Sequence, residues 1–265
     1  MTSLPFMDAP PLPDWAHVAS IIDYKKTHLL PQILRTLQSN ANIFALDPVY
    51  CTRRQDVAFH EVLLRLQDDN GKQISPADVF ATAAQYGMAT EVNLFIIYHQ
   101  FAFHSQFDAM MSINISPLLL TNRKARTLFW KMLKAYALCG QAGNVILEVL
   151  EDQRLPLSAN LISFMEKVAA LGYKWALDDY GDGHHTEAHI RHLPLSYIKL
   201  SGATSEDLAQ RDQTPAASAG LEALKACKRL NLPVVAEHIS DARQMENLER
   251  WYGIHLFQSQ TPAFR

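Results

Sequence analysis

The chain has 265 residues, of which 48% are hydrophobic, and 24 basic against 27 acidic side chains give a formal net charge of −3. This balance excludes a broad cationic surface for polymeric nucleic acid. Three widely spaced cysteines favour a reducing compartment over a disulfide framework. Because no run approaches the roughly 20 apolar residues of a membrane helix, we expect a soluble cytoplasmic protein with no membrane span.

Residues 1–40 are predicted to form a helical N-terminal extension. A proline-rich start gives way to a stretch with helical apolar spacing, in which Pro31 marks a break or a second helix start. We expect residues 41–265 to form a single barrel domain. The extension is then a surface through which a protein partner could bind.

From residue 43 onward, strand-like and helix-like runs alternate. The strand candidates are residues 43–50, 58–66, 110–116, 145–151, 173–180, 196–201, 233–239 and 253–259. Helices are predicted over about 76–103, 122–139, 158–171, 186–192, 217–230 and 241–252, whereas residues 203–220 are polar enough to be a mobile loop. This alternation predicts an α/β fold, a TIM-barrel-like (β/α)8 barrel.

Acidic and amide residues recur where the strand candidates reach their C-terminal ends. They are Glu61, Asn114, Glu148, Asp178, Asp179 and Glu237. In a barrel of parallel strands these ends meet at one mouth, where TIM-type active sites lie. Oxygen ligands from distant positions are therefore predicted to converge there.

The order of these residues resembles that of the EAL-domain cyclic-di-GMP phosphodiesterases, over about residues 44–262. The matching motifs read Glu-Val-Leu-Leu-Arg at 61–65, Ser-Ile-Asn-Ile-Ser at 112–116, Leu-Glu-Val-Leu-Glu at 147–151, Ala-Leu-Asp-Asp-Tyr-Gly-Asp-Gly at 176–183, Leu-Pro-Leu-Ser-Tyr-Ile-Lys-Leu at 193–200, Val-Val-Ala-Glu-His at 234–238 and Gln258. Each motif alone is weak, but seven in family order are specific. The resemblance implies an EAL-type barrel that hydrolyses cyclic-di-GMP to linear pGpG.

The resemblance also implies a pair of divalent cations, Mg²⁺ or Mn²⁺, which favour oxygen ligands. One ion would be held by Glu61, Asn114, Glu148 and Asp178. If Asp178 bridges the two ions, Asp179 would reach the second, and Glu237 would bind directly or through water. Paired ions can activate a water and neutralise charge on a phosphodiester.

Further roles are carried over from the family to single positions. Lys199 would be catalytic, either as a charge that orients water or as a general base, although proton abstraction needs a lowered pKa. Glu151, grouped with the catalytic residues, resembles the glutamate that braces the loop after Asp179. Arg65, a planar donor suited to phosphate, and Gln258 and Asp47 would lie on the substrate side. A homodimer near that loop is a further expectation.

Several positions depart from the family pattern. The middle residue of the signature is Val62, and the usual Asp-Phe-Gly-Thr-Gly-Tyr-Ser-Ser loop reads Asp-Tyr-Gly-Asp-Gly-His-His-Thr at 179–186. Ser201 replaces the acid of Lys-x-Asp, and Ser240 replaces the second acid of Glu-Gly-Val-Glu. Asp47 replaces a glutamine. The loss of two carboxylates would weaken a network that orients Lys199 and the cations.

These departures keep alternatives open. The chain could be a catalytically weak or inactive cyclic-di-GMP receptor that acts through a protein partner, or a protein-interaction module without nucleotide. The adjacent His184 and His185 could suggest zinc, which prefers nitrogen and sulfur ligands. The ordered acidic set favours the enzyme over all of these interpretations.

Overall fold

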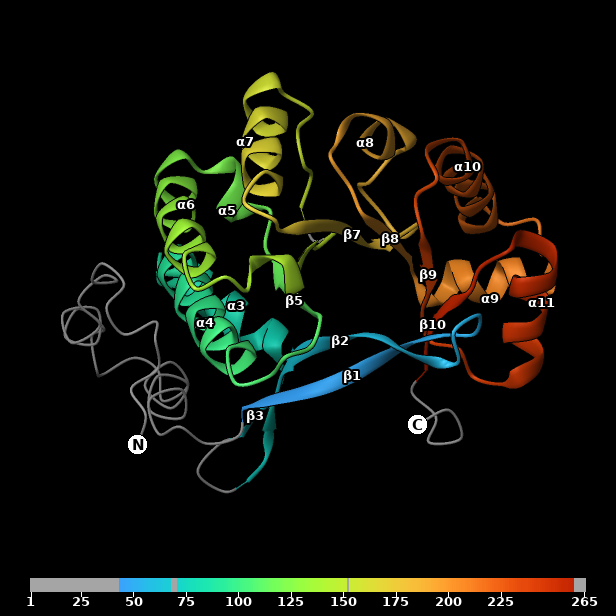
Figure 1. Cartoon of the computed structure of the whole chain (residues 1–265), viewed down its shortest axis with the longest axis horizontal. Coiled ribbons are helices and arrows are strands. Elements are labelled where there is room, and N and C mark those ends of the chain that lie inside the picture. The colour runs from blue at the N-terminus through green and yellow to red at the C-terminus, as the bar shows by residue number, and fades with distance from the viewer. Residues whose placement is uncertain (1–42, 68–70, 152, 260–265) are drawn as a thin grey trace.

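Eight strands close into a barrel, with helices around its outside (Figure 1). In this computed structural model, residues 43–67, 71–151 and 153–259 are described. The barrel strands are β1 (Phe44–Cys51), β2 (Asp56–Leu64), β5 (Met111–Ile115), β6 (Val145–Val149), β7 (Lys174–Tyr180), β8 (Tyr197–Leu200), β9 (Val234–Ala236) and β10 (Leu256–Gln258). The predicted TIM-barrel-like α/β fold is confirmed. The extension predicted over residues 1–40 lies outside the described residues.

The helices connect the strands in sequence. They are α3 (Pro76–Gln85), α4 (Ala89–His104), α5 (Leu118–Thr121), α6 (Arg123–Ala137), α7 (Ala159–Ala169), α8 (Glu187–His192), α9 (Gly202–Gln210), α10 (Pro215–Leu230) and α11 (Ala242–Tyr252). A small sheet of β3 (Leu66–Gln67) and β4 (Gln73–Ile74) follows β2, and a 3-10 turn at Ala142–Asn144 precedes β6. Within the described ranges, no helix combines the length and the apolar character needed to cross a membrane.

One barrel strand runs against the others. β1 pairs antiparallel with both β2 and β10, whereas all other neighbours in the barrel are parallel. The expectation of an all-parallel barrel was therefore wrong. Only residues 52–55 separate β1 from β2, and a parallel crossover needs about a dozen residues or more. A hairpin, with Gln55 at φ 57°, is what such a short connection allows.

Two helix predictions also differ from the structure. The helix predicted over 76–103 is two helices, α3 and α4, because the chain turns at Gly87, whose φ is +67°. The segment 203–220, predicted to be a loop, is mostly helical in α9 and the start of α10. Some of the polar residues that suggested a loop are buried in α9, where Thr204 and Ser205 are both fully covered.

Side-chain caps explain where several helices begin. Asn122, Ser158, Thr214 and Asp241 each accept a hydrogen bond from the backbone of the first turn that follows. Such caps satisfy donors that have no partner inside the helix and contribute about 1 kcal/mol each. Ser201 caps α9 in the same way, which fixes the turn between β8 and α9 beside the mouth of the barrel.

The two faces of the strands have different neighbours. Outward residues such as Ile113, Leu147 and Leu177 belong to one large cluster with the surrounding helices. Inward residues form a smaller barrel core that includes Val49, Phe59, Ile146, Ala176, Val235 and Leu256. Because successive side chains on a strand alternate between faces, the residue two positions after each inward residue also faces the barrel interior.

Candidate functional site

Most of the predicted site residues form the layer above the apolar barrel core. Six of them lie two positions after an inward apolar or aromatic residue: Phe59 is followed by Glu61, Ile146 by Glu148, Ala176 by Asp178, Tyr197 by Lys199, Val235 by Glu237 and Leu256 by Gln258. The period of two along a strand therefore brings these polar side chains to one level. Glu61 lies in the middle of β2, not at its end as predicted, because β2 continues past the barrel with β1.

Lys199 lies at the centre of this layer, and its side chain is only 1% exposed. Its Nζ is 2.7 Å from Glu237 Oε1, 2.9 Å from Asp178 Oδ1, 3.0 Å from Glu61 Oε2 and 3.1 Å from Glu148 Oε2. Four carboxylates from β2, β6, β7 and the end of β9 thus meet one ammonium group. The convergence predicted from the strand ends is present for these residues.

Two amide side chains complete the layer. Asn114 Nδ2 donates to Glu61 Oε1 at 2.8 Å. Gln258 Nε2 donates to Glu61 Oε2 at 2.9 Å and to Asp47 Oδ2 at 3.0 Å. The strand register explains why Gln258 contacts both residues, since Asp47 on β1 is paired with Glu61 on β2. Gln258 thus links the predicted substrate side to the predicted cation side.

Burial and mutual repulsion shift the ionisation of the cluster. Burial raises the pKa of Glu148 to about 8 and that of Asp178 to about 6, and Lys199 opposes both rises while neighbouring carboxylates add to them. Burial alone would lower the pKa of Lys199, but the four carboxylates outweigh it and hold this pKa well above its ordinary value. The four carboxylates therefore favour the protonated form of Lys199.

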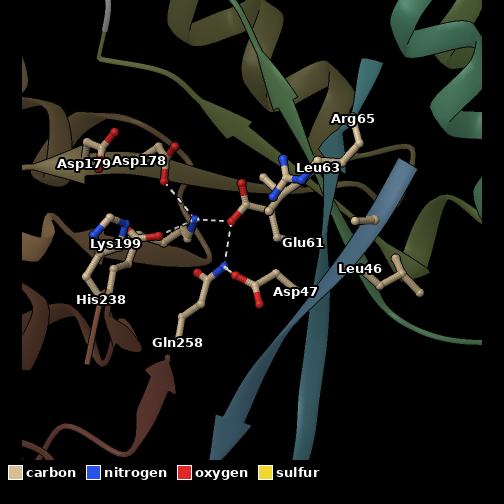
Figure 2. Close-up of a pocket in the computed structure, with 12 residues that line it drawn as sticks. Leu46, Asp47, Glu61, Leu63, Arg65, Asp178, Asp179, Lys199, His238 and Gln258 are labelled. Atoms are coloured by element: carbon tan, nitrogen blue, oxygen red, sulfur yellow. Dashed lines mark hydrogen bonds and ion pairs between the residues drawn. The ribbon is translucent and has the colours of Figure 1, made fainter. Parts of the chain in front are cut away.

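The layer forms the floor of a cleft of about 670 Å³ (Figure 2). Its lining residues are Ala45, Leu46, Asp47, Glu61, Leu63, Arg65, Asp178, Asp179, Lys199, Glu237, His238 and Gln258. Arg65 is exposed at the rim, and its Nη1 donates to the carbonyl of Leu64 at 3.0 Å. A cation at the rim and an acidic floor suit a ligand that carries phosphate groups beside metal ions.

The loop after β7 is shaped by unusual backbone conformations. The pairing of β7 with β8 is irregular between Leu177 and Tyr180, and Asp179 has φ +49°. This irregularity aims two successive carboxylates toward the mouth, as bulges beside active sites often do. Asp178 is buried in the cluster, whereas Asp179 is exposed on the cleft wall.

Glu151 lies outside the lysine cluster and contacts this loop instead. Its Oε1 accepts a hydrogen bond from the backbone N–H of His185. Burial raises the pKa of Glu151 to about 7, and the charges of Asp179 and Asp182 add to the rise while the bond from His185 opposes it. The contact agrees with a residue that braces the loop. Glu151 is not among the residues that line the cleft.

The two positions that lack the family's acids have different surroundings. Ser201 donates to Asp182 Oδ1 at 2.7 Å, so a carboxylate from the changed loop stands beside Ser201. Ser240 bonds Gln244 Oε1 at the start of α11 and lines a separate groove. The carboxylate of Asp182 therefore offsets the lost acid at Ser201, whereas the hydroxyl of Ser240 contacts the amide of Gln244.

The histidine pair does not form a metal site in the described part of the chain. His185 is buried, with its ring 5.6 Å from that of His189, and burial lowers its pKa to about 4. Among the described residues, the one group with ligand atoms close enough to share an ion is Glu61, Glu148 and Asp178, within 4.8 Å of one another. Oxygen ligands are thus favoured over a zinc site with histidines.

The donor set fits divalent cations. Asn114 Oδ1 is buried and has no hydrogen-bond partner among the described residues, which leaves an amide oxygen available. Fully ionised, five carboxylates against Lys199 would carry a formal charge of minus four, which two divalent ions would balance; the five are Glu61, Glu148, Asp178, Asp179 and Glu237. Hard cations of this kind prefer such oxygen ligands.

One polar residue of the cleft lining was not predicted from the sequence. His238 follows Glu237 and lines the cleft with φ +56°. The available signal was that the family pattern has glycine at this position, since glycine often marks a left-handed backbone. Leu46 and Leu63 were also missed, because isolated apolar residues carry no pattern.

Comparison with known proteins places the chain in a family. The model of the EAL domain matches residues 31–258. The chain is 23% identical over 221 residues to the cyclic di-GMP phosphodiesterase PdeF of Escherichia coli, which covers 82% of this chain and 29% of PdeF. The chain thus spans less than a third of the length of that relative.

Solved structures agree in fold. The phosphodiesterase MucR of Pseudomonas aeruginosa, in complex with c-di-GMP, has a TM-score of 0.70 at 21% identity, over 88% of this chain and 95% of that one. BlrP1 of Klebsiella pneumoniae, with manganese and cyclic di-GMP, has a TM-score of 0.66 at 22% identity, over 82% of this chain and 54% of that one. The resemblance seen in the motifs is confirmed, and the chain belongs to the EAL domain family.

Proposed function

We propose that this chain is a metal-dependent phosphodiesterase that hydrolyses one phosphodiester bond of cyclic-di-GMP to give linear pGpG. The observation that carries the proposal is the convergence of four carboxylates on the buried Lys199, at the floor of a cleft with Arg65 on its rim. Membership of the EAL family and the named activity of PdeF support the same substrate.

The ligand assignments follow the donors present. Glu61, Asn114, Glu148 and Asp178 would hold one Mg²⁺ or Mn²⁺, and Asp179 with Glu237 would hold the second. When bound, the two ions would activate a water and neutralise charge on the phosphodiester. BlrP1, with manganese in its complex, supports a cation of this class.

The chain's own residues have separable tasks. Lys199 is a fixed positive charge in a buried setting, where it stabilises negative charge that develops on the phosphoryl group. Arg65 can turn from the carbonyl of Leu64 to a phosphate with its planar guanidinium. Asp47 would accept hydrogen bonds from a guanine edge, and its contact with Gln258, which also donates to Glu61, supports this role.

A second candidate is a weak or inactive receptor for cyclic-di-GMP. It is favoured by Ser240, whose hydroxyl contacts Gln244 and leaves the cleft without the acid of the family pattern. A homodimer and a protein partner bound through residues 1–40 remain predictions, and light scattering of the purified chain would test the homodimer.

Product analysis separates the candidates. Protein is incubated with cyclic-di-GMP and Mn²⁺ or Mg²⁺, and nucleotides are resolved by chromatography. We expect pGpG from the wild type and at least a hundredfold slower release from Glu61→Gln, which removes a charged ligand (about 3 kcal/mol of transition-state stabilisation). His192→Ala, an exposed change at the end of α8, is the control. Binding of cyclic-di-GMP without product would select the receptor, and no binding would contradict both.

A further inference from the structure

Helix α6 gives the molecule a surface of one charge sign. Its cations are Arg123, Lys124, Arg126, Lys131 and Lys134. Residues 109–147, which include this helix, contain no aspartate or glutamate, so all 27 acidic residues of the chain lie elsewhere. The outer helices α10 and α11 carry acidic and basic residues together, as solvated surfaces usually do. The charge on α6 is therefore a local feature in a chain whose formal net charge is −3.

Three of these cations share one side of the helix, which lies on the outside of the barrel (Figure 1). Lys124, Lys131 and Lys134 are all exposed, and separations of seven and three residues return to the same side of an α-helix. The other side, with Phe129 and Leu133, is buried in the large hydrophobic cluster. The three lysines, which we call the basic stripe, extend about 15 Å along the helix axis. They form a line and do not converge on one point.

The basic stripe has no ion-pair partner in the described part of the chain. None of the salt bridges formed there includes Lys124, Lys131 or Lys134. Lys134 Nζ lies 5.5 Å from the centre of the Trp130 ring, a contact that does not remove its charge. The stripe thus presents uncompensated positive charge to the solvent, and an anionic surface opposite it would be attracted.

An apolar groove of about 720 Å³ lies beside the basic stripe, where α6 and α7 end. Lys131 and Lys134 line it together with Ala135, Leu138, Ala170 and Leu171. The side chain of Leu138 is 90% exposed, the largest value among the exposed large hydrophobic residues of the described ranges. Positive charge and exposed apolar surface therefore lie next to each other.

We propose that the basic stripe and this groove dock reversibly on the anionic surface of a lipid bilayer, with the lysines at the headgroups and Leu138 at the boundary of the acyl chains. A bilayer offers both chemistries in one plane. Several basic residues on an amphipathic helix are typical of proteins that bind anionic lipids. A line of charges fits such a plane, whereas a single soluble anion needs donors that converge on it.

This docking is separate from the proposed function. The residues that line the cleft include none from α6 or α7. The bilayer would therefore meet a side of the barrel that does not form the cleft, and substitutions in the basic stripe leave the acidic layer unchanged. Three lysines each strengthen binding about fivefold near an anionic surface, which predicts weak binding that salt reverses.

The test is sedimentation with vesicles. The full chain, with a chelator present, is mixed with vesicles of phosphatidylcholine alone or of phosphatidylcholine with phosphatidylglycerol. The charge variant combines Lys131→Glu with Lys134→Glu. The matched control combines Lys225→Glu with Lys228→Glu, the same change three residues apart on α10. Leu138→Ser removes the apolar contact without a change of charge. All five positions are exposed, so the variants are expected to fold.

We expect the wild type to sediment with the mixed vesicles, to stay in solution with phosphatidylcholine alone, and to be released as salt rises. The Lys131 and Lys134 variant should bind about thirtyfold more weakly, because two lysines are lost. Leu138→Ser should bind about fivefold more weakly, and the control should match the wild type.

Three results would overturn the inference. The first is no sedimentation of the wild type with the mixed vesicles, or equal sedimentation with both kinds. The second is an equal loss in the two lysine pairs, or unchanged binding by Leu138→Ser. The third is retention on immobilised polyglutamate as strong as on the mixed vesicles, which would assign the stripe to an acidic protein. Neither nucleotide nor metal is present, so a protein that releases no pGpG but shows the expected sedimentation would contradict the proposed function alone.

Discussion

The hydroxyl of Ser201 donates a hydrogen bond to Asp182 Oδ1 at 2.7 Å, and thereby joins the turn before α9 to the loop after β7. The same hydroxyl accepts from the backbone N–H of Thr204 at 3.2 Å. A Cβ on Gly181 would lie 2.1 Å from Thr204 Oγ1, so the loop approaches this turn as closely as glycine allows. The loop that carries Asp179 is therefore held by Ser201, Asp182 and Gly181 together.

This relationship predicts that Ser201→Ala and Asp182→Asn are coupled. Each variant changes one partner of the same hydrogen bond. The double variant should therefore lose less stability than the sum of the two single losses, with a coupling free energy of about 1 kcal/mol. Urea unfolding of the wild type and the three variants measures it. Additive losses would show that the bond does not hold the loop. Glu206→Gln, an exposed change on α9, controls for charge removal nearby.

Replacement of Lys199 should destabilise the metal-free protein. Lys199→Met leaves four buried carboxylates without their cation, and loss of one partner in a buried ion pair costs about 3–5 kcal/mol. Saturating Mn²⁺ should restore much of this stability, because the ion supplies the missing positive charge. Thermal unfolding with and without Mn²⁺ tests both statements, with the exposed Lys167→Met as the matched control. A variant as stable as the control without metal would contradict the role of Lys199.

Glu151 should make stability depend on pH in a defined window. Its pKa in the fold is about 7, above the ordinary value of 4.5, so ionisation of this carboxyl opposes folding. The stability contribution is complete below about pH 4.5, declines as pH rises to about 7 and is constant above that. Glu151→Gln should remove this decline.

The measurement is the urea midpoint at several values of pH from 4.5 to 8. Relative to the wild type, Glu151→Gln should gain stability as pH rises through the window, because glutamine keeps an oxygen that accepts from His185 N–H without a charge to bury. Glu166→Gln on the exposed face of α7 should run parallel to the wild type. Parallel curves for Glu151→Gln as well would show that Glu151 titrates normally in the fold.

Asp47 should influence binding of the nucleotide more than turnover. Its Oδ2 accepts from Gln258 at 3.0 Å on the cleft wall. Asp47→Ala should raise the KM for cyclic-di-GMP about three- to tenfold, as loss of one hydrogen bond predicts, with kcat changed less than twofold. Asp47→Asn, which keeps an acceptor, should have a smaller effect. A fall in kcat at constant KM would assign Asp47 to the chemical step instead.

The fold and the cluster were accessible from sequence because both depend on a period of two. Apolar residues such as Ile146 and Val235 mark the inward face of a strand, and Glu148 and Glu237 continue that face by two positions. The alternation of side chains along each strand and the order of the strands therefore predict the cluster before any contact is known. The four residues between β1 and β2 also indicate the antiparallel hairpin, because a parallel crossover needs about a dozen residues.

What the sequence did not reveal depends on partners far along the chain. The hydrogen bond from Ser201 to Asp182 sets a carboxylate from the changed loop beside the position that lacks the family's acid. In the sequence, Ser201 alone indicates a lost carboxylate and Asp182 alone indicates an added charge. Helix α9 was missed because Thr204 and Ser205 are buried polar residues, a situation that tertiary packing alone decides. His238 was missed because a left-handed φ in a histidine leaves no apolar pattern.

The acidic layer should hold two divalent cations beside Lys199, and anomalous diffraction from crystals grown with Mn²⁺ would show whether it does. Two manganese peaks are expected in the cleft, one bound by Glu61, Asn114, Glu148 and Asp178 and the other by Asp179 with Glu237, and Lys199 should lose part of its present contacts. A cleft without manganese, in which Lys199 Nζ still contacts all four carboxylates, would contradict it.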